Sequence, residues 1–516
     1  MTNPGIHSRL PLLILAALLA TVATTHFLAL DSGHRWWGDF SLYMTHAKNI
    51  VESQPYAATN IIVNPDVAGF SPPSYPPVYP LLLAPLYKYF GLDLFPPKVL
   101  NLAFFIVSLF IFYWYFAGKL SSWVSATGVT AALAFSPWFW ELKNIINSDL
   151  PFVFFLLTTL IVADRFSALP RQSRYYWLTA FALGVLTYLS YGTRSLGLLL
   201  IPALVLHDLL TKRTIRPGTL LAIAVFALLH QLQSHLLDIN VDSSYVSDAV
   251  TMSTDDSGSA STSTIEIIVG VVSGFAENIR PNLTLYAGVL LNHWWNNISS
   301  AFMIFMTITT GLLALTGFTR SCFKNISVTT VYFVIYICAL IVVPVNQDYR
   351  YMLPVLPFYL VYIFIGAEYL ADQLTTSRIF RQIPLVVIVL IGLTYTGKYF
   401  FSEEAPVYES ITDAEAIELY DYIRNNTPVD SHIKFAEPRI LALFTDRNSS
   451  VYNFNYESLN EIWAEFRRAG ATHLLVYNKN VEWAEFANNR RLTHKFEKYL
   501  QPVFTSGHFA LYTIKP

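Results

Sequence analysis

The chain has 516 residues, of which 54% are hydrophobic and 13% are charged, and its formal net charge is −2. Soluble domains carry about 25% charged residues. This composition, with a mean hydropathy of +0.42, excludes an ordinary soluble protein and predicts a polytopic α-helical membrane protein. The sequence has no basic stripe, which excludes nucleic acid as an expected partner.

Long apolar runs recur through most of the chain. A bilayer core requires about 20 apolar residues per helix, and the runs that meet this length predict about eleven transmembrane helices. In chain order they are residues 10–30, 98–117, 121–138, 151–165, 176–191, 195–210, 217–235, 298–318, 327–345, 352–371 and 383–400. The first run is longer than the apolar core of a signal peptide, so we expect it to be a retained helix.

The distribution of Lys and Arg predicts the orientation of these helices. Basic residues gather in alternate connections, at 119, 165–174, 212–216, 320–324 and 378–381. The positive-inside rule places these connections and the N-terminus in the cytoplasm. An odd number of helices then places the C-terminus outside, and we expect a multi-pass protein of a bacterial inner (cytoplasmic) membrane with a periplasmic C-terminal region.

Three segments on the predicted outer side are too long to be simple turns. Residues 31–97 are rich in proline, and the short apolar piece 78–90 predicts an interfacial or re-entrant helix. Residues 236–297 begin with a polar stretch and end with amphipathic sequence. Residues 1–401 are therefore interpreted as a transmembrane catalytic domain that contains both loops.

Residues 402–516 have the composition of a soluble domain. "DAEAIELYDYIRNN" and "ESLNEIWAEFRRAG" have helical periodicity, and "HIKFAE", "SVYNF" and "THLLVYN" are typical of short strands. This alternation predicts a small α/β domain with a mainly parallel sheet. The domain has no Gly-rich phosphate loop, so no nucleotide site is expected in it.

The stretch "HRWWGDFSLYMTHAKNI" places Asp39 just beyond the first predicted helix, among Trp36, Trp37, Phe40 and Tyr43. Partial desolvation by these rings would raise the pKa of a carboxyl group and make it a better base. The alternative is an ordinary exposed acid of a loop near an aromatic belt.

A second acid, Asp149, begins a predicted span in "NSDLPFVFFLLTTL". Ser148 or Asp149 can cap that helix, and Pro151 suits its first turn, which is the structural alternative for this acid. The predicted topology places Asp149 on the same side of the membrane as Asp39. Two carboxylates on one side can hold a divalent metal ion or share acid–base work.

Several cations are expected on that side as well. Arg194 and Arg350 lie in short connections between predicted spans, and Lys88 and Lys98 lie at the end of the first loop. Fixed cations stabilise a phosphate that gains charge in a transition state. Snorkelling, or pairing of Arg350 with Asp348, is the alternative. The histidines His34, His46 and His293 are candidate ligands or structural groups.

Five motifs in this order are similar to those of the multispanning glycosyltransferases of the GT-C superfamily. They are "GDFSLYMTHAKNI", "SYPPVYPLLLAPLYKYFG", "NSDLPFVFFLLTTL", "YGTRSLGLLLIPALVL" and "DYRYMLPVLPFYLV". The resemblance covers most of residues 10–372. It is strongest to the bacterial branch with lipid A aminoarabinose transferase, protein O-mannosyltransferases and glycosyltransferases of the lipopolysaccharide core.

The resemblance implies a polyprenyl-phosphate-linked sugar donor and transfer, with inversion, to a lipid, glycan or protein acceptor outside the cytoplasmic membrane. Asp39 corresponds to the family's base or metal ligand and Asp149 to its second acid, with a divalent metal as a candidate cofactor. Lys88, Arg194, Arg350 and Tyr351 correspond to residues that contact the lipid phosphate. Many relatives carry an Asp-Glu pair in the first loop, whereas Phe40 follows Asp39 here, which weakens the case for a metal.

Two other classes of protein remain open from the sequence. A transporter or flippase of lipid-linked saccharides would explain the many spans, although charges inside the spans are few. A non-catalytic envelope protein that binds a partner through residues 402–516 is the other alternative.

Overall fold

The chain divides into two compact units. The computed structural model describes residues 9–36, 38–64, 74–120, 122–237, 300–342, 349–373, 410–453, 458–477 and 489–515, with single positions between 386 and 395. The helical unit comprises Met1–Leu30, Lys98–Leu236 and Asn240–Glu404, and the mixed unit comprises Asp31–Pro97, Leu237–Ile239 and Ala405–Pro516. The predicted loop 236–297 and the predicted span 383–400 lie almost wholly outside the described residues.

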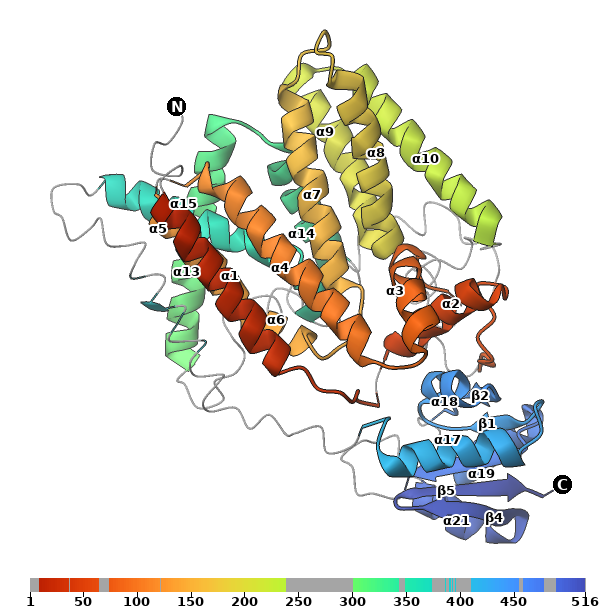
Figure 1. The fold of residues 1–516 in the computed structure, drawn as a ribbon. Helices are drawn as coiled ribbons and strands as arrows, with labels where there is room; N and C mark the ends of the chain where they lie inside the picture. Colours follow the sequence, from red (N-terminus) through yellow and green to blue (C-terminus); the bar gives the residue numbers. More distant parts are fainter. Residues whose placement is uncertain are drawn as a thin grey trace. The chain divides into compact units, whose positions relative to one another are not determined.

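The helical unit contains long apolar helices (Figure 1). In chain order they are α1 (Arg9–Leu28), α4 (Phe95–Ala117), α5 (Trp123–Ala134), α6 (Pro137–Leu142), α7 (Asp149–Ala168), α8 (Tyr176–Thr193), η1 (Ser195–Leu199), α9 (Leu200–Lys212), α10 (Pro217–Leu237), α13 (Ser300–Lys324), α14 (Val328–Val342), η3 (Tyr349–Met352) and α15 (Leu356–Gln373).

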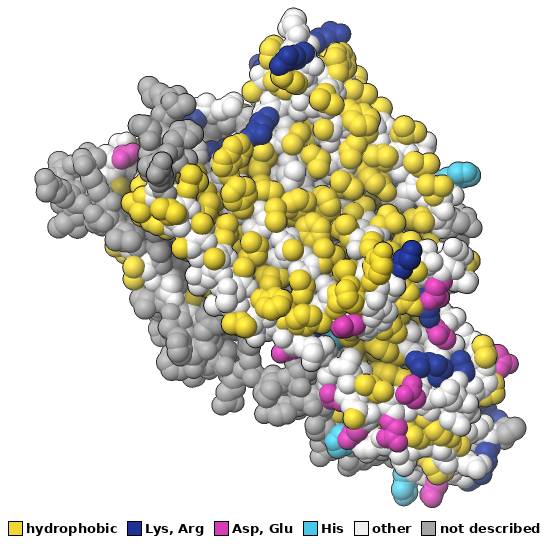
Figure 2. Space-filling view, in the orientation of Figure 1, with side chains coloured by type: hydrophobic (Ala, Val, Ile, Leu, Met, Phe, Trp, Pro, Cys, Tyr) yellow, Lys and Arg dark blue, Asp and Glu magenta, His cyan; other side chains and the backbone are white. Residues whose placement is uncertain are grey.

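Five of the described segments are long and apolar enough to cross a membrane. They are Leu10–Leu28, Phe95–Ala117, Asp149–Ala168, Ser195–Lys212 and Pro217–Leu237. The chain is thus a multi-pass membrane protein, but the predicted number of about eleven spans is not confirmed. Figure 2 shows hydrophobic side chains over the visible face of the helical unit, where soluble proteins would carry charges.

The predicted span 121–138 is wrong as a single helix. The structure ends α5 at Ala134 and begins α6 at Pro137. Ser136, between them, has an extended backbone with ψ 127. The cause is local, because the ring of a proline disfavours the helical conformation of the residue before it and fits well at the first position of a new helix.

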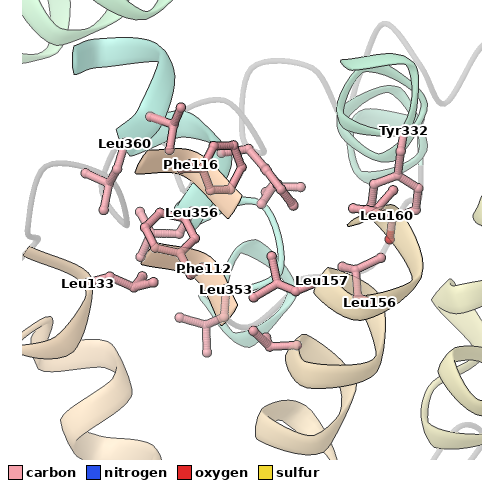
Figure 3. Packing of buried hydrophobic residues seen from close by; sticks show 14 of the residues in the cluster. Phe112, Phe116, Leu133, Leu156, Leu157, Leu160, Tyr332, Leu353, Leu356 and Leu360 are labelled. Atoms are coloured by element: carbon pink, nitrogen blue, oxygen red, sulfur yellow. The ribbon is translucent and has the colours of Figure 1, made fainter. Parts of the chain in front are cut away.

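Large side chains of α4, α5, α7, α14 and α15 form the core of the helical unit. Figure 3 shows Phe112 and Phe116 of α4 between leucines of α7 and α15, including Leu157 and Leu356, which are all buried. At the contact of α13 with α15, a Cβ atom on Gly317 would lie 1.9 Å from the carbonyl oxygen of Tyr362. Helices in membranes use such small residues to approach closely.

The mixed unit joins two helices of the first loop to the C-terminal α/β domain. The loop supplies α2 (Phe40–Glu52) and α3 (Val78–Phe90), and α3 confirms the helix predicted at 78–90. The C-terminal elements are α17 (Ala414–Asn426), β1 (His432–Lys434), α18 (Pro438–Thr445), β2 (Asn448–Ser450), α19 (Leu459–Arg468), β3 (His473–Tyr477), α21 (Asn489–Lys495), η5 (Glu497–Tyr499), β4 (Leu500–Ser506) and β5 (Phe509–Ile514).

The five strands form one mixed sheet in the order β2-β1-β3-β5-β4. The strand β1 pairs parallel with both β2 and β3, as the sequence predicts, with Ile433 opposite Ser449 and His473. The antiparallel hairpin of β4 and β5 was not predicted, and it makes the sheet mixed rather than mainly parallel. Its turn contains Gly507, which has a φ of +53, a conformation that favours glycine.

Segments of the first loop pack directly on the C-terminal domain. The ring of Trp36 lies 5.4 Å from that of Phe509 and 5.8 Å from that of Phe435. The backbone N–H of Ile62 donates to the carbonyl of Ser449 at 2.9 Å, so residues 60–62 extend the sheet beside β2. The first loop and the C-terminal domain are therefore one body in this fold.

Candidate active site

Asp39 lies at the start of α2, where its carboxylate is bound from two directions. Its Oδ1 accepts a hydrogen bond from the Tyr75 hydroxyl at 2.7 Å and faces the Nη1 of Arg439 at 3.5 Å. The side chain keeps 29% of its exposure. The preceding Gly38 has a φ of +104, which favours glycine, and so the entry into α2 depends on this residue. The result is an acid that is held in place yet remains partly accessible.

The backbone of Tyr75 is fixed by two other side chains of the first loop. Its N–H donates to Nε2 of His46 at 3.2 Å, and its carbonyl accepts from the hydroxyl of Tyr56 at 2.8 Å. Its ring lies 4.6 Å from that of Tyr43, on the first turn of α2. These contacts determine where the Tyr75 hydroxyl points, and they bring it to Asp39.

His46 acts here as a neutral structural group. Its Nδ1 lies 2.9 Å from the carbonyl oxygen of Tyr56, which requires a proton on Nδ1, and its Nε2 accepts from Tyr75. Burial lowers the pKa of His46 to about 4, so the ring is uncharged at neutral pH. Both ring nitrogens are used, and of the two roles that the sequence left open for His46 the structure favours the structural one. His34 bonds to the backbone carbonyl of Arg35 through Nδ1.

Asp149 lies in the helical unit, at the first residue of α7. The helices α7 and α8 are antiparallel neighbours, so the start of α7 and the end of α8 come together. Arg194, which follows α8, forms an ion pair with Oδ1 of Asp149, and Nη1 of Arg350 lies 3.9 Å from Oδ2. The Arg194 guanidinium also lies over the ring of Tyr351, 5.0 Å from its centre. These contacts bring together four of the predicted site residues: Asp149, Arg194, Arg350 and Tyr351.

The surroundings of Asp149 differ from those of an ordinary helix cap. Ser148 occupies the cap position but makes no capping hydrogen bond with its side chain, and the Asp149 carboxylate is 2% exposed. The N–H of Asp149 donates to the side chain of Asn147 at 3.3 Å, and Asn101 of α4 donates to the Asn147 carbonyl at 3.1 Å. The acid is therefore fixed by neighbouring elements, and the two arginines give the cluster a net positive charge of one.

The structure places the two predicted lysines in different environments. Lys88 lies exposed on the last turn of α3, where the described chain forms no ion pair with it. Lys98 is fully buried in the first turn of α4. The Asp348 alternative for Arg350 and the candidate ligand His293 lie outside the described residues.

The donor set around Asp149 does not fit a cation. Each of its two carboxylate oxygens faces a guanidinium group. A metal ion would have to compete there with fixed positive charge. The described segments also contain no group of three or more His, Cys, Asp or Glu side chains arranged to hold a metal. We therefore derive no chemical step through a metal ion.

No protein-family model and no curated protein matches the sequence, but solved structures match the fold. The oligosaccharyltransferase AglB of Archaeoglobus fulgidus, solved with an inhibitory peptide and a dolichol-phosphate, superposes with a TM-score of 0.58 at 12% identity. The match covers 92% of this chain and 70% of AglB. The chain has the GT-C fold.

Two further structures extend this GT-C likeness. ArnT of Cupriavidus metallidurans, bound to undecaprenyl phosphate, matches with a TM-score of 0.51 at 11% identity over 96% of this chain and 97% of ArnT. The Archaeoglobus fulgidus oligosaccharyltransferase in complex with Zn and sulfate matches with a TM-score of 0.56 at 11% identity. This match covers 97% of this chain and 73% of the oligosaccharyltransferase chain. The GT-C resemblance of the five motifs is thereby confirmed for the fold.

Sequence reasoning missed two residues of the Asp39 site. Tyr75 lies in the motif "SYPPVYP". The prolines and aromatic rings of this motif do not indicate a role for the Tyr75 hydroxyl. Arg439 lies 400 positions from Asp39, in the region that the sequence predicts to be a small soluble α/β domain. A local pattern cannot indicate a contact of that sequence separation.

Proposed function

We propose that the protein is an integral membrane glycosyltransferase that uses a polyprenyl-phosphate-linked sugar as its donor. It transfers the sugar to an acceptor at the outer face of the cytoplasmic membrane, with inversion at the anomeric carbon. The observation that carries the proposal is a GT-C fold with a partly exposed, doubly bound carboxylate at the start of α2. AglB and ArnT, which share the fold, bind dolichol-phosphate and undecaprenyl phosphate, which supports the donor class.

The roles follow from the surroundings of each group. Asp39 takes the proton of the acceptor hydroxyl, whose oxygen bonds to the anomeric carbon from the face opposite the phosphate. The bond from that carbon to the phosphate oxygen breaks, and its electron pair leaves with the lipid phosphate. A partly exposed carboxylate that is oriented by Tyr75 is suited to this step, because a general base must reach the proton it removes.

We assign the positive charge for the departing phosphate to Arg194 and Arg350, with Tyr351 beside Arg194. Lys88, in the other unit, stays a predicted phosphate contact. Arginine suits this role because its planar group donates two parallel hydrogen bonds to phosphate oxygens. We assign Asp149 to the orientation of the two arginines, since its buried carboxylate pairs with both. Fixed cations of this kind stabilise charge that develops in a transition state.

The proposal is tested by sugar transfer in membranes that contain equal amounts of wild-type protein or Asp39→Asn. A radiolabelled pool of polyprenyl-phosphate sugars serves as donor. Removal of a general base costs about 10²- to 10⁴-fold in rate, so we expect the variant to lose transfer. The control is Asp421→Asn, an exposed acid of the same unit with 58% side-chain exposure, which should keep full activity. Full transfer by Asp39→Asn would refute the assigned base.

A further inference from the structure

The C-terminal domain reaches Asp39 with one side chain. Arg439 lies in the first turn of α18, after Pro438, and its side chain is 11% exposed. Its Nη1 is 3.5 Å from Oδ1 of Asp39, in the first loop. The helix α18 packs against α2, the helix that Asp39 begins. A domain that is distant in sequence therefore contributes to the surroundings of the proposed base.

Independent contacts fix the position of α18 relative to the first loop. Beyond the end of α18, Asp446 pairs with Lys48 of α2 at 2.6 Å. Asn64 of the first loop also donates to Glu465 of α19 at 2.9 Å, and Glu465 is itself bound by Lys434 in a buried ion pair at 2.8 Å. The Arg439 contact is thus one of several attachments between the first loop and the C-terminal domain.

The Arg439 pair differs from these attachments in its partner. Lys48 and Asp446 form a partly exposed pair, and such pairs contribute little to stability. Arg439 instead faces the same carboxylate oxygen that accepts from Tyr75. Two donors on one oxygen restrict the rotation of the carboxylate, and a neighbouring positive charge favours its ionised form.

We propose that Arg439 is a positioning residue for Asp39, so that the C-terminal domain completes the catalytic site through this side chain. The inference rests on the proposed function, because it takes Asp39 to be the base. It predicts a loss in kcat with little change in the KM for the donor, since Arg439 acts on the orientation and charge of Asp39. A purely structural role predicts instead that activity follows the amount of folded protein.

The test uses the full-length protein with Arg439→Ala, Arg439→Lys and the matched control Arg424→Ala. Arg424 is an arginine of α17 in the same domain, with 45% side-chain exposure. We expect Arg439→Ala to lose about tenfold or more in kcat, Arg439→Lys to keep an intermediate activity, and Arg424→Ala to remain unchanged. Millimolar guanidinium chloride should restore part of the Arg439→Ala activity, whereas the same concentration of sodium chloride should not.

The outcomes separate the role of Arg439 from the role of Asp39. An unchanged kcat in Arg439→Ala, or a loss in kcat that guanidinium does not restore in protein with wild-type thermal stability, overturns the inference. If Arg439→Ala does not fold, Arg439→Gln replaces it. Glutamine keeps most of the aliphatic stem and an N–H donor, but it is shorter and uncharged, so we expect a similar loss in kcat. Asp39→Asn is measured in parallel: full transfer in that variant refutes the proposed base, whereas an inactive Asp39→Asn with normal Arg439 variants refutes only the role of Arg439.

Discussion

The two acids predicted from the sequence, Asp149 and Asp39, differ in their exposure and in the groups that bind them. The Asp149 carboxylate is 2% exposed and has a guanidinium group at each oxygen. The Asp39 carboxylate is 29% exposed, and a neutral phenol and one guanidinium both bind its Oδ1. The Asp149 carboxylate compensates the charge of both arginines, and its removal would leave two cations close together without a counter-charge. We infer that Asp149 organises positive charge, whereas Asp39 performs proton transfer.

The largest expected effect concerns the stability of the Asp149 cluster. Asp149→Asn leaves Arg194 and Arg350 close together without their shared counter-charge. Removing one partner of a buried ion pair typically costs about 3–5 kcal/mol. We expect a marked fall in the thermal stability of the purified variant, relative to wild type and to Asp421→Asn. A variant of wild-type stability would show that Asp149 does not hold the two arginines.

The second effect is a dependence of stability on pH through His46, which positions Tyr75 for Asp39. The pKa of His46 is about 4 in the folded protein and 6.5 for the free side chain. Between these values the unfolded chain binds more protons, so stability is retained above pH 6.5 and is lost as the pH falls toward 4. The difference corresponds to about 3 kcal/mol.

Thermal unfolding of wild type and His46→Gln over this pH range measures the effect. Glutamine cannot take up the proton. The unfolding temperature of the variant should therefore fall less than that of wild type as the pH falls from 6.5 toward 4. Parallel curves for the two proteins would contradict the neutral role of His46.

The third effect concerns donor binding at the arginines. Arg350→Met removes one charged contact to the proposed lipid phosphate, and such contacts contribute about 1.5–3 kcal/mol. We expect the KM for the donor to rise about tenfold or more. Undecaprenyl phosphate should also become a weaker competitor of the donor to a similar degree. A normal KM with a reduced kcat would assign Arg350 to the chemical step alone.

The smallest effect concerns Tyr75. Tyr75→Phe keeps the ring contact with Tyr43 and removes one hydrogen bond to the Asp39 carboxylate. A single bond of this kind contributes about 1–2 kcal/mol, so kcat should fall severalfold while the KM for the donor stays constant. The matched control is Tyr87→Phe, which removes an exposed hydroxyl contact to Glu52 in the same unit. Equal effects of both variants would show that the Tyr75 bond has no special role.

The sequence predicted the parts of the site that depend on short-range order along the chain. Two consecutive apolar helices must run antiparallel, which placed Asp149 and Arg194 at the same end, as the structure shows. Helical periodicity and alternation likewise predicted α17, α19, β1 and β3, whereas β2 lies at Asn448–Ser450 and shares only Ser450 with the predicted strand "SVYNF". The break at Pro137 follows from local sterics, but the continuous apolar composition of 121–138 concealed it.

Contacts between distant segments could not be predicted in this way. The bond between Arg439 and Asp39 depends on the packing of α18 against α2, and the extension of the sheet by residues 60–62 depends on the exposed edge of β2. Trp36 was expected to shield Asp39 from water, with an aromatic belt as the alternative, and its packing on Phe435 and Phe509 was not predicted. A sequence specifies which groups are available, and tertiary packing determines which of them meet.

The most direct test of the role of Asp39 measures donor binding and sugar transfer in the same purified preparation of Asp39→Asn. If Asp39 is the base and the arginines bind the lipid phosphate, the variant binds undecaprenyl phosphate as tightly as wild type and transfers sugar at least about a hundredfold more slowly. Wild-type transfer would contradict the role of Asp39 as the base. Loss of lipid-phosphate binding together with transfer would contradict the division of roles between Asp39 and the arginine cluster of Asp149.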